Sequence, residues 1–367
     1  MNNIKKYYIL ILYTLFFLSI FNFANSKNFE KYNNAKKMSN YFSGILHLNN
    51  NNYLGSYKNF KQLEGLEDSH YIYSRLYQYN LINLEKFDEA YQYTKKLKRK
   101  NISNFESDLI SGVFYLKNKK FNLALDSFKS LKKNKNQNPI QKLLSINLEN
   151  WLTIKDIDNK EDALAIILAK ESQFKNFNKI QEAFIHCYYR SNETSKKFKN
   201  LVTDSKSDFS RYNFFHANYL YKNGKIENAK NIVKKTINIE NQNLILNQLQ
   251  LDMQTKKYEN FSNKFDCKKL SNIVAELFYI IANVSSSNSM YSISNFYLNL
   301  AKYLNPDFIS FERLYAENFF AINDLNNAKK LYLKISKSGS FYSWYSAKQN
   351  VKIFVRQNKI KEAQSYL

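Results

Sequence analysis

One block of sequence recurs near the start of the chain, at residues 50–63, 84–97 and 118–131, so that successive copies begin thirty-four positions apart. Each copy has a polar turn, an aromatic residue, a small residue three positions later and a final leucine. The aromatic, small and leucine positions of the three copies are, in order, Tyr53, Phe87, Phe121; Ser56, Ala90, Ala124; and Leu63, Leu97, Leu131. A fixed period of this length is typical of repeat proteins, in which each repeat is one supersecondary unit that stacks on its neighbours.

The composition favours helices over strands and turns. A chain of 367 residues could hold two or three globular domains or one solenoid. It contains only 6 glycines and 2 prolines, so there are few turn formers and helix breakers, and its hydrophobic content of 44% is enough for a core.

The repeat resembles the tetratricopeptide repeat (TPR), whose two helices A and B carry small residues at the eighth and twentieth positions. Counted from Lys37, Gly44 and Gly112 occupy the eighth position, whereas Gln78 does not. Two helices pack with axes 8–10 Å apart only if the residues at their crossing are small. The nine small residues that define the repeat are Gly44, Ser56, Ala90, Gly112, Ala124, Ala229, Ser294, Ala328 and Ala363. The resemblance implies an all-α fold, a right-handed α-solenoid of about ten TPR-like helical hairpins.

The chain divides into five segments on this interpretation. Residues 1–26 resemble a signal peptide, with Lys5 and Lys6 before an apolar run and a small-x-small end at Ala24 and Ser26; an uncleaved anchor is the alternative. A linker over 27–36 leads into TPR-like repeats 1–3 over 37–138, degenerate helical repeats over 139–272, and TPR-like repeats over 273–367. The last repeat is incomplete, so we expect a truncated chain or an end that a partner or second copy covers.

Residues that could bind metals or form disulfides are few. The four histidines, which are His47, His70, His186 and His216, show no spacing of a helical metal site. Cys187 and Cys267 fall two hairpins apart, which in a linear stack is on the order of 20 Å. A disulfide needs Cα atoms within about 7 Å. We therefore expect both thiols to be unpaired.

No set of catalytic residues emerges, and we expect no metal, no cofactor and no enzymatic activity. The chain has no phosphate-binding loop, nucleophile elbow or Cys-x-x-Cys pair. One fragment, Glu171-Ser172-Gln173-Phe174, resembles the start of the catalytic domain of soluble lytic transglycosylases, but the later Gly-Leu-Met-Gln segment of that family is missing. The alternative function is therefore the helical superhelix arm of such a peptidoglycan-acting enzyme, with its catalytic domain absent from this chain.

Two surfaces are candidates for binding. The resemblance implies a concave groove lined by A helices, and its partner-binding positions carry over to Tyr41, Arg75, Tyr79, Arg211, Phe214, Asn218, Tyr221 and Arg313, with Lys348 in the last repeat. A basic outer stripe on the B helices is formed by Lys61, Lys95, Lys129, Lys199 and Lys234. A solvated face near helix C-termini accounts for such a stripe without any ligand.

The charge permits an anionic partner but does not require one. The formal net charge is +24, from 55 Lys and Arg against 31 Asp and Glu, and such a balance attracts cell-wall polymers, membrane surfaces or nucleic acid. Lys, Asn, Ile, Phe and Tyr all have AT-rich codons, so codon bias explains most of the charge. We expect an exported, periplasmic or envelope-associated scaffold that binds a protein or peptide partner in its groove, with no nucleic-acid role.

Overall fold

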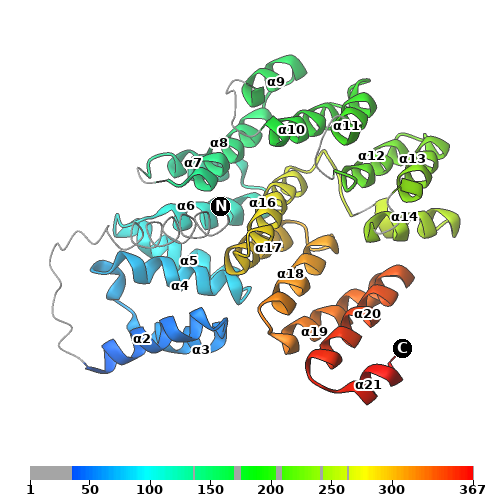
Figure 1. Cartoon of the computed structure of the whole chain (residues 1–367). Coiled ribbons are helices and arrows are strands. Elements are labelled where there is room, and N and C mark those ends of the chain that lie inside the picture. The colour runs from blue at the N-terminus through cyan, green and yellow to red at the C-terminus, as the bar shows by residue number, and fades with distance from the viewer. Residues whose placement is uncertain are drawn as a thin grey trace, which may run out of the picture. The chain divides into compact units, whose positions relative to one another are not determined.

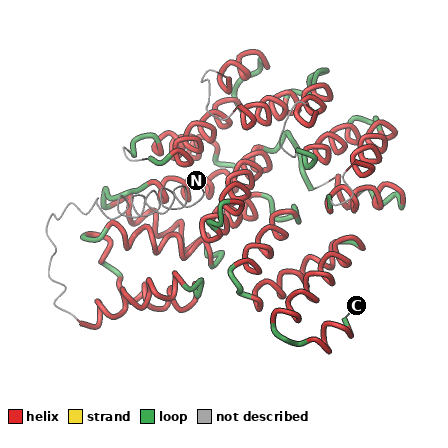
Figure 2. The backbone as a smooth tube through the Cα atoms, viewed as in Figure 1, coloured by secondary structure: helices red, strands yellow, loops and turns green. Residues whose placement is uncertain are grey.

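The computed structural model describes residues 35–134, 137–168, 175–203, 209–239, 243–262 and 264–366. Across these ranges the chain is helical and has no strand (Figure 2). The signal-peptide prediction over 1–26, most of the linker and the Glu171–Phe174 fragment lie outside the described residues.

The chain divides into two compact units, Met1–Ser74 and Arg75–Leu367. The described part of the first unit holds α2 (Ala35–Asn49), α3 (Tyr53–Phe60) and two 3₁₀ turns at Lys61–Leu63 and Leu66–Asp68. Helix α4 (Tyr71–Asn83) begins in the first unit and ends in the second.

The second unit continues the series of antiparallel helix pairs (Figure 1). Its helices are α5 (Phe87–Arg99), α6 (Phe105–Lys117), α7 (Phe121–Leu131), α8 (Pro139–Ile154), α9 (Lys160–Leu168), α10 (Lys175–Tyr188), α11 (Thr194–Thr203), α12 (Tyr212–Lys222), α13 (Ile226–Ile239), α14 (Leu244–Gln254), α15 (Glu259–Ser262), α16 (Leu270–Ser287), α17 (Tyr291–Leu304), α18 (Ser310–Ala321), α19 (Leu325–Ile335), α20 (Ser340–Arg356) and α21 (Ile360–Ser365), with a 3₁₀ turn at Ser336–Ser338. With α2–α3 and α4–α5, the described residues form ten hairpins, in agreement with the predicted all-α solenoid of TPR-like units.

The turn inside the hairpin is the most regular feature of the described residues. In nine of the ten hairpins, the second residue after helix A has positive φ. These residues are Asn51, Glu85, Lys119, Arg190, Gly224, Lys256, Ser289, Asn323 and Asn358. The next residue donates its N–H to the carbonyl five positions earlier, at 2.8–2.9 Å each time. This is the Schellman arrangement, which satisfies carbonyls at a helix end. Because it persists at Arg190, Gly224 and Lys256, the middle repeats keep the hairpin although their sequence pattern is degenerate.

The small residues lie where the two helices of a hairpin cross. All nine are buried, and the six of them that are serine or alanine between Ser56 and Ala328 are 0% exposed. A Cβ on Gly112 would lie 2.2 Å from the ring of Phe128, and one on Gly44 would lie 2.4 Å from the ring of Phe60. Real Cβ atoms do not approach a neighbour so closely, so these two crossings need glycine.

In the second repeat, different side chains fill the crossing of helices A and B. Gln78 takes the position of the two glycines, and Thr94 takes the position that Phe60 and Phe128 hold in the repeats before and after it. Gln78 and Thr94 are both buried. The larger residue therefore lies on helix A in the second repeat and on helix B in the repeats before and after it, and the interior can be close-packed in both arrangements.

Helices α16 and α17 fold back onto earlier repeats of the second unit. Helix α16 contacts α6 and α8, and α17 contacts α6 (Figure 1). Tyr79 stacks on Phe296 with ring centroids 5.3 Å apart, and Phe87 stacks on Tyr303 at 4.0 Å. Repeats from distant parts of the sequence therefore pack together, unlike in a linear stack, where each repeat touches only its neighbours.

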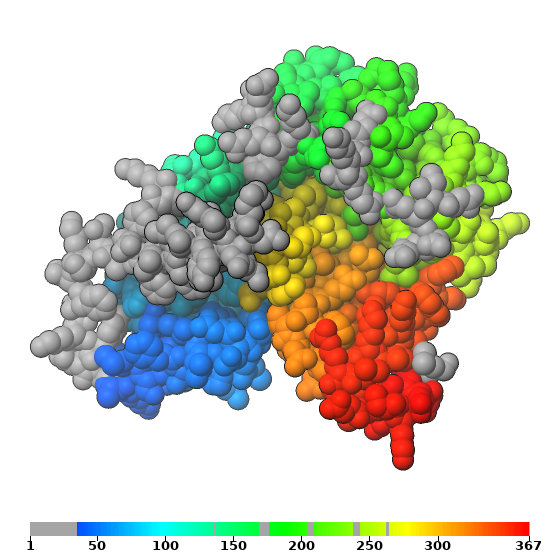
Figure 3. Space-filling view, viewed as in Figure 1, coloured from blue at the N-terminus to red at the C-terminus, as the bar shows by residue number. Residues whose placement is uncertain are grey.

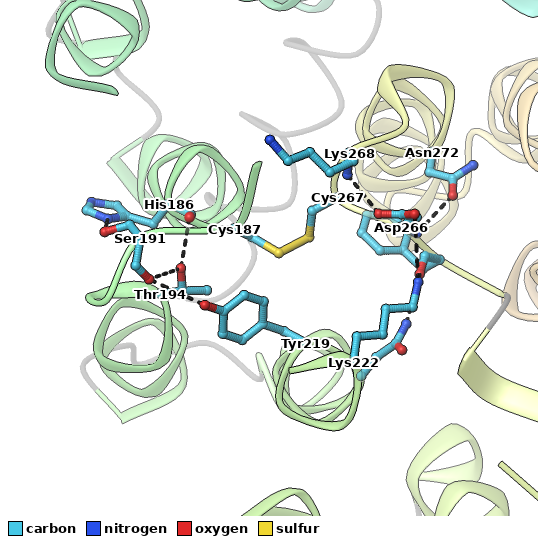
Figure 4. The surroundings of a disulfide bond; sticks show 12 residues. His186, Cys187, Ser191, Thr194, Tyr219, Lys222, Asp266, Cys267, Lys268 and Asn272 are labelled. Carbon is cyan, nitrogen blue, oxygen red and sulfur yellow. Dashed lines mark hydrogen bonds and ion pairs between the residues drawn. A yellow bond between two sulfur atoms is a disulfide. The ribbon is translucent and has the colours of Figure 1, made fainter. Parts of the chain in front are cut away.

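The prediction of two unpaired thiols is wrong, because Cys187 and Cys267 form a disulfide with Cα atoms 5.8 Å apart (Figure 4). The predicted distance assumed a linear stack, in which two hairpins are two layers apart. Helix α15 is only 4 residues long, and the chain after it returns along α12 to α10. Phe265 packs against Phe184 and Phe215, with ring centroids 5.5 and 4.6 Å away, which places Cys267 beside α10.

Helices long and apolar enough to cross a membrane do not occur within the described ranges.

Candidate binding pocket between α14, α18 and α20

Arg211, a predicted groove residue, lies in the interior of the second unit. Its guanidinium donates two hydrogen bonds to the carboxylate of Glu276, at 2.9 and 2.8 Å, and lies 3.8 Å from the centroid of the Tyr279 ring. The Glu276 side chain is 1% exposed. Burial raises the pKa of Glu276, and the charge of Arg211 opposes that change. A bidentate pair of this kind fixes α12 to α16, so Arg211 does not line an open groove, which corrects that part of the prediction.

Two neighbours of Arg211 on α12 are also buried. Phe214 is 2% exposed and stacks on Phe308, and the Asn218 amide donates to the carbonyl of Phe265 at 2.9 Å. Both side chains are used for packing within the chain, which corrects the expectation that they face a groove. Tyr221 is half-buried and stacks on Tyr258.

The remaining groove positions are divided between the two units. Tyr41 packs against His70 in the first unit. In the second unit, Arg75 is exposed and forms an ion pair with Glu106 at 2.9 Å. Tyr79 of α4 stacks on Phe296 of α17. Arg313, another of the eight predicted groove residues, lines a concave surface in the second unit.

That surface, which we call the basic pocket, has a volume of about 750 Å³. Helix α14 contributes two residues, α18 contributes Arg313, and α20 contributes most of the wall; the lining residues are Leu244, Asn247, Arg313, Ser340, Phe341, Trp344, Tyr345, Lys348, Gln349 and Lys352. In Figure 3 the yellow-green surface of α14 adjoins the orange-red surface of α20.

The pattern of α20 explains how one helix supplies a whole wall. Counted from Phe341, the residues Trp344, Tyr345, Lys348 and Lys352 stand three, four, seven and eleven positions later, which places them on one face of a helix. Helix α20 packs on α14 and α19. The pocket therefore receives a continuous row of three aromatic rings followed by two ammonium groups.

Two polar groups of the basic pocket, those of Arg313 and Tyr345, share one partner, Glu317. Arg313 lies 3.5 Å from Glu317, and the Tyr345 hydroxyl donates to the same Glu317 oxygen at 2.6 Å. Burial alone would lower the pKa of Arg313, but the charge of Glu317 outweighs it and raises the pKa. The Lys348 ammonium lies 5.4 Å from the centroid of the Trp344 ring, within cation–π distance.

The charge of the pocket selects the ligands that it can take. Its lining includes Arg313, Lys348 and Lys352 but no aspartate or glutamate. Trp344 is 63% exposed, so a large aromatic face is open to a ligand. Aromatic and arginine side chains are the usual anchors of protein interfaces. The arrangement suits a ligand with a carboxylate or another anionic group next to an apolar or planar group.

The predicted basic stripe falls on, or directly after, the second helix of five hairpins. In the second unit Lys129, Lys199 and Lys234 are exposed on α7, α11 and α13, and the half-buried Lys95 on α5 lies 5.7 Å from the Tyr91 ring centroid. In the first unit Lys61 is exposed, and its ammonium donates to the Tyr57 hydroxyl. Whether these lysines bind a ligand stays a prediction.

Sequence reasoning missed most of the basic pocket. The spacing of Trp344, Tyr345 and Lys352 around the predicted Lys348 is a signal that could have found the α20 wall. Leu244 and Asn247 carry no such signal, because they reach the pocket only through the contact of α14 with α20, which are far apart in sequence.

Groups of three or more histidine, cysteine, aspartate or glutamate side chains able to hold a metal ion are absent from the part of the chain that the structure describes.

No family model and no curated protein matches the chain. Two solved structures align with 90% of it at 13% identity each. One is the TPR domain of P58(IPK), of which 91% is covered at a TM-score of 0.28, and the other is Naa15/Naa10 bound to HypK-THB, of which 68% is covered at a TM-score of 0.24. TM-scores this low do not establish a shared fold. The TPR-like character of the chain rests on its own hairpins, period and buried small residues.

Proposed function

We propose that this chain is an exported, non-enzymatic helical scaffold that binds an acidic segment of a partner protein in the cell envelope. The basic pocket carries the proposal, because three cationic side chains and an exposed tryptophan line one concave surface with no acidic residue among them. The pocket replaces the predicted groove as the binding site, since the A-helix positions of the middle repeats are buried within the chain.

The disulfide supports the proposed export. Disulfides persist in oxidising compartments such as the periplasm and are rare in the cytosol. Cys187 and Cys267 are bonded, and the segment 1–26 resembles a signal peptide. These two observations come from different parts of the chain and favour the same compartment.

The test uses fluorescently labelled peptides that carry aspartate and glutamate around one phenylalanine, with peptides of reversed charge as controls. Purified protein should bind the acidic peptides, and a triple variant Arg313→Gln, Lys348→Gln, Lys352→Gln should bind them at least tenfold more weakly. A matched variant, Lys129→Gln, Lys199→Gln, Lys234→Gln, removes the same charge from the predicted stripe and should bind normally. Equal losses in the two variants would show that only net charge matters and would refute the pocket assignment.

The competing role as the arm of a peptidoglycan-acting enzyme is tested in parallel with isolated cell-wall sacculi. Binding to sacculi that salt abolishes, together with no acidic-peptide binding, would favour that role, since exposed charges are screened by salt.

A further inference from the structure

A second, smaller cavity lies in the same unit, among α12, α14, α15, the turn before α18, and α20. Its volume is about 340 Å³, and it is lined by Phe214, Ile245, Gln248, Leu249, Asp252, Asn260, Phe261, Lys264, Phe308, Ile309, Lys337, Ser338, Gly339 and Tyr342. We call it the Asp252 cavity. Ligand pockets in proteins range over roughly 300–1,000 Å³, so this one suits a small molecule better than an extended peptide.

The acidic wall of the cavity is held in place by a chain of hydrogen bonds. Asp252 accepts from the amides of Gln248 and Asn260 at 2.9 and 3.0 Å, and both bonds reach the same oxygen, Oδ1. Gln248 in turn accepts from the backbone N–H of Phe341 at 3.0 Å. Gly339 adopts φ +139°, and a Cβ there would lie 2.3 Å from the Gln248 amide. The carboxylate therefore has a fixed orientation that depends on a glycine.

Two residues that line the cavity each present a polar atom with no hydrogen-bond partner among the described residues. Asp252 is 5% exposed, and its second oxygen Oδ2 accepts no bond from them. Tyr342 is 4% exposed, and its hydroxyl makes no hydrogen bond with them. Burial raises the pKa of Tyr342; the charges of Arg313 and Arg211 oppose that rise, and the charge of Asp252 adds to it. Neither polar atom is among the fully buried polar atoms of the described residues, so both are open to a ligand that enters the cavity.

The other charges of the cavity have the opposite sign. Lys264 and Lys337 line it, and neither forms a salt bridge within the described ranges. Phe214, Leu249 and Phe308 give an apolar side that is buried. A simple cation would meet two ammonium groups and a simple anion would meet Asp252, so a ligand that carries both charges on an apolar body fits best.

We propose that the Asp252 cavity binds a free α-amino acid with an apolar side chain. The ligand ammonium donates to Asp252 Oδ2 and to the Tyr342 oxygen, and its carboxylate accepts from Lys264 and Lys337. The apolar side chain lies against the aromatic wall. This site is distinct from the basic pocket and does not depend on peptide binding there.

The experiment is a thermal-shift screen of the full chain against the standard amino acids at millimolar concentration, followed by calorimetry on the best one. A ligand that binds only the folded state raises the melting temperature. At least one apolar amino acid should do so, while its N-acetyl form, which lacks the ammonium, and its amide, which lacks the carboxylate, should each bind at least tenfold more weakly. No shift with any amino acid, or equal binding of the blocked forms, would overturn the proposal.

Variants locate the binding. Asp252→Asn keeps Oδ1 as an acceptor for Gln248 and Asn260, so it should fold with little change in melting temperature and lose at least tenfold in affinity. Tyr342→Phe removes only the hydroxyl and should weaken binding about fivefold, which corresponds to one lost hydrogen bond of about 1 kcal/mol. Asp126→Asn, at an exposed position on α7, is the matched control and should bind normally. Unchanged affinity in Asp252→Asn would place the ligand elsewhere.

Discussion

At the scale of single residues, the fold depends on pairs of positions that exchange volume across a hairpin. Gly44 faces Phe60 and Gly112 faces Phe128, because a ring on helix B fills the space that a side chain on helix A would need. The small residue at the twentieth position has the same role from the other helix. Each such site tolerates little change, since a close-packed core cannot accept extra atoms without moving the helices.

Ala90 gives the direct test of the repeat register. It is 0% exposed on α5, so Ala90→Glu should lower the free energy of unfolding by about 3 kcal/mol or more, through overpacking and an unpaired buried charge. Chemical denaturation measures the loss. Gln92→Glu adds the same charge at an exposed position of the same helix and should change stability little. A wild-type midpoint for Ala90→Glu would contradict the register.

Asp108 on α6 should make stability depend on pH. Burial raises its pKa to about 6, although Lys98 and Lys133 oppose the rise. Its folded-state pKa exceeds the unfolded value, so the folded state binds the proton more tightly, and stability from this group falls as pH rises through about 6. Asp108→Asn should therefore raise the melting temperature at pH 7.5 relative to wild type, and the difference should shrink at pH 4.5. A difference that does not vary with pH would count against this assignment.

At the scale of elements, the turn between helices is more regular than the helices themselves. Eight of the nine left-handed turn residues are not glycine. For residues with a side chain this conformation costs roughly 1–2 kcal/mol. Two features offset this conformational cost. The turn directs helix B back along helix A, and the capping bond satisfies a carbonyl that would otherwise have no partner.

Lys119 tests this cost. It has φ +57° between α6 and α7, so Lys119→Gly should raise the free energy of unfolding by about 0.5–1 kcal/mol, since glycine adopts this conformation without strain. Lys120→Gly is the matched control: its φ is −88°, and glycine there should lower stability by a similar amount. Urea denaturation of both variants would show changes of opposite sign, and a loss in both would contradict the argument.

At the scale of the whole second unit, long-range contacts convert a stack of hairpins into a closed packing. Lys302 forms an ion pair with Glu85 at 2.7 Å, and Asn299 donates to Asn83 at 3.3 Å. The Arg211–Glu276 pair and the disulfide fix the return of the chain after α15. These contacts bury surfaces that a linear solenoid would leave open to a ligand.

The disulfide should contribute strongly to stability, because it joins residues 80 apart in sequence. The double variant Cys187→Ser, Cys267→Ser should unfold with a free energy lower by about 2–4 kcal/mol. Reductant should destabilise the wild type by a similar amount and leave the double variant unchanged, which controls for effects of serine itself. If reductant does not change the unfolding midpoint of the wild-type protein, the prediction is contradicted.

The helices, the hairpins and the residues at their crossings follow from local patterns in the amino-acid sequence. These features depend on the three- and four-position spacing within a helix and on the period of the repeat, and the contacts that they produce lie within one repeat or between neighbours. Ala90 and Gly112 could be placed in the core for this reason.

Which surfaces stay open depends instead on long-range packing in the folded chain. The fold-back of α16 and α17 joins parts of the chain that are distant in sequence. The same is true of the pairing of Cys187 with Cys267, the ion pair of Arg211 with Glu276 and the two cavities. No periodic pattern encodes such contacts, because they depend on the short helix α15 and on the route of the chain after it. The same tyrosines and arginines that a repeat pattern assigns to a groove can therefore lie in the interior.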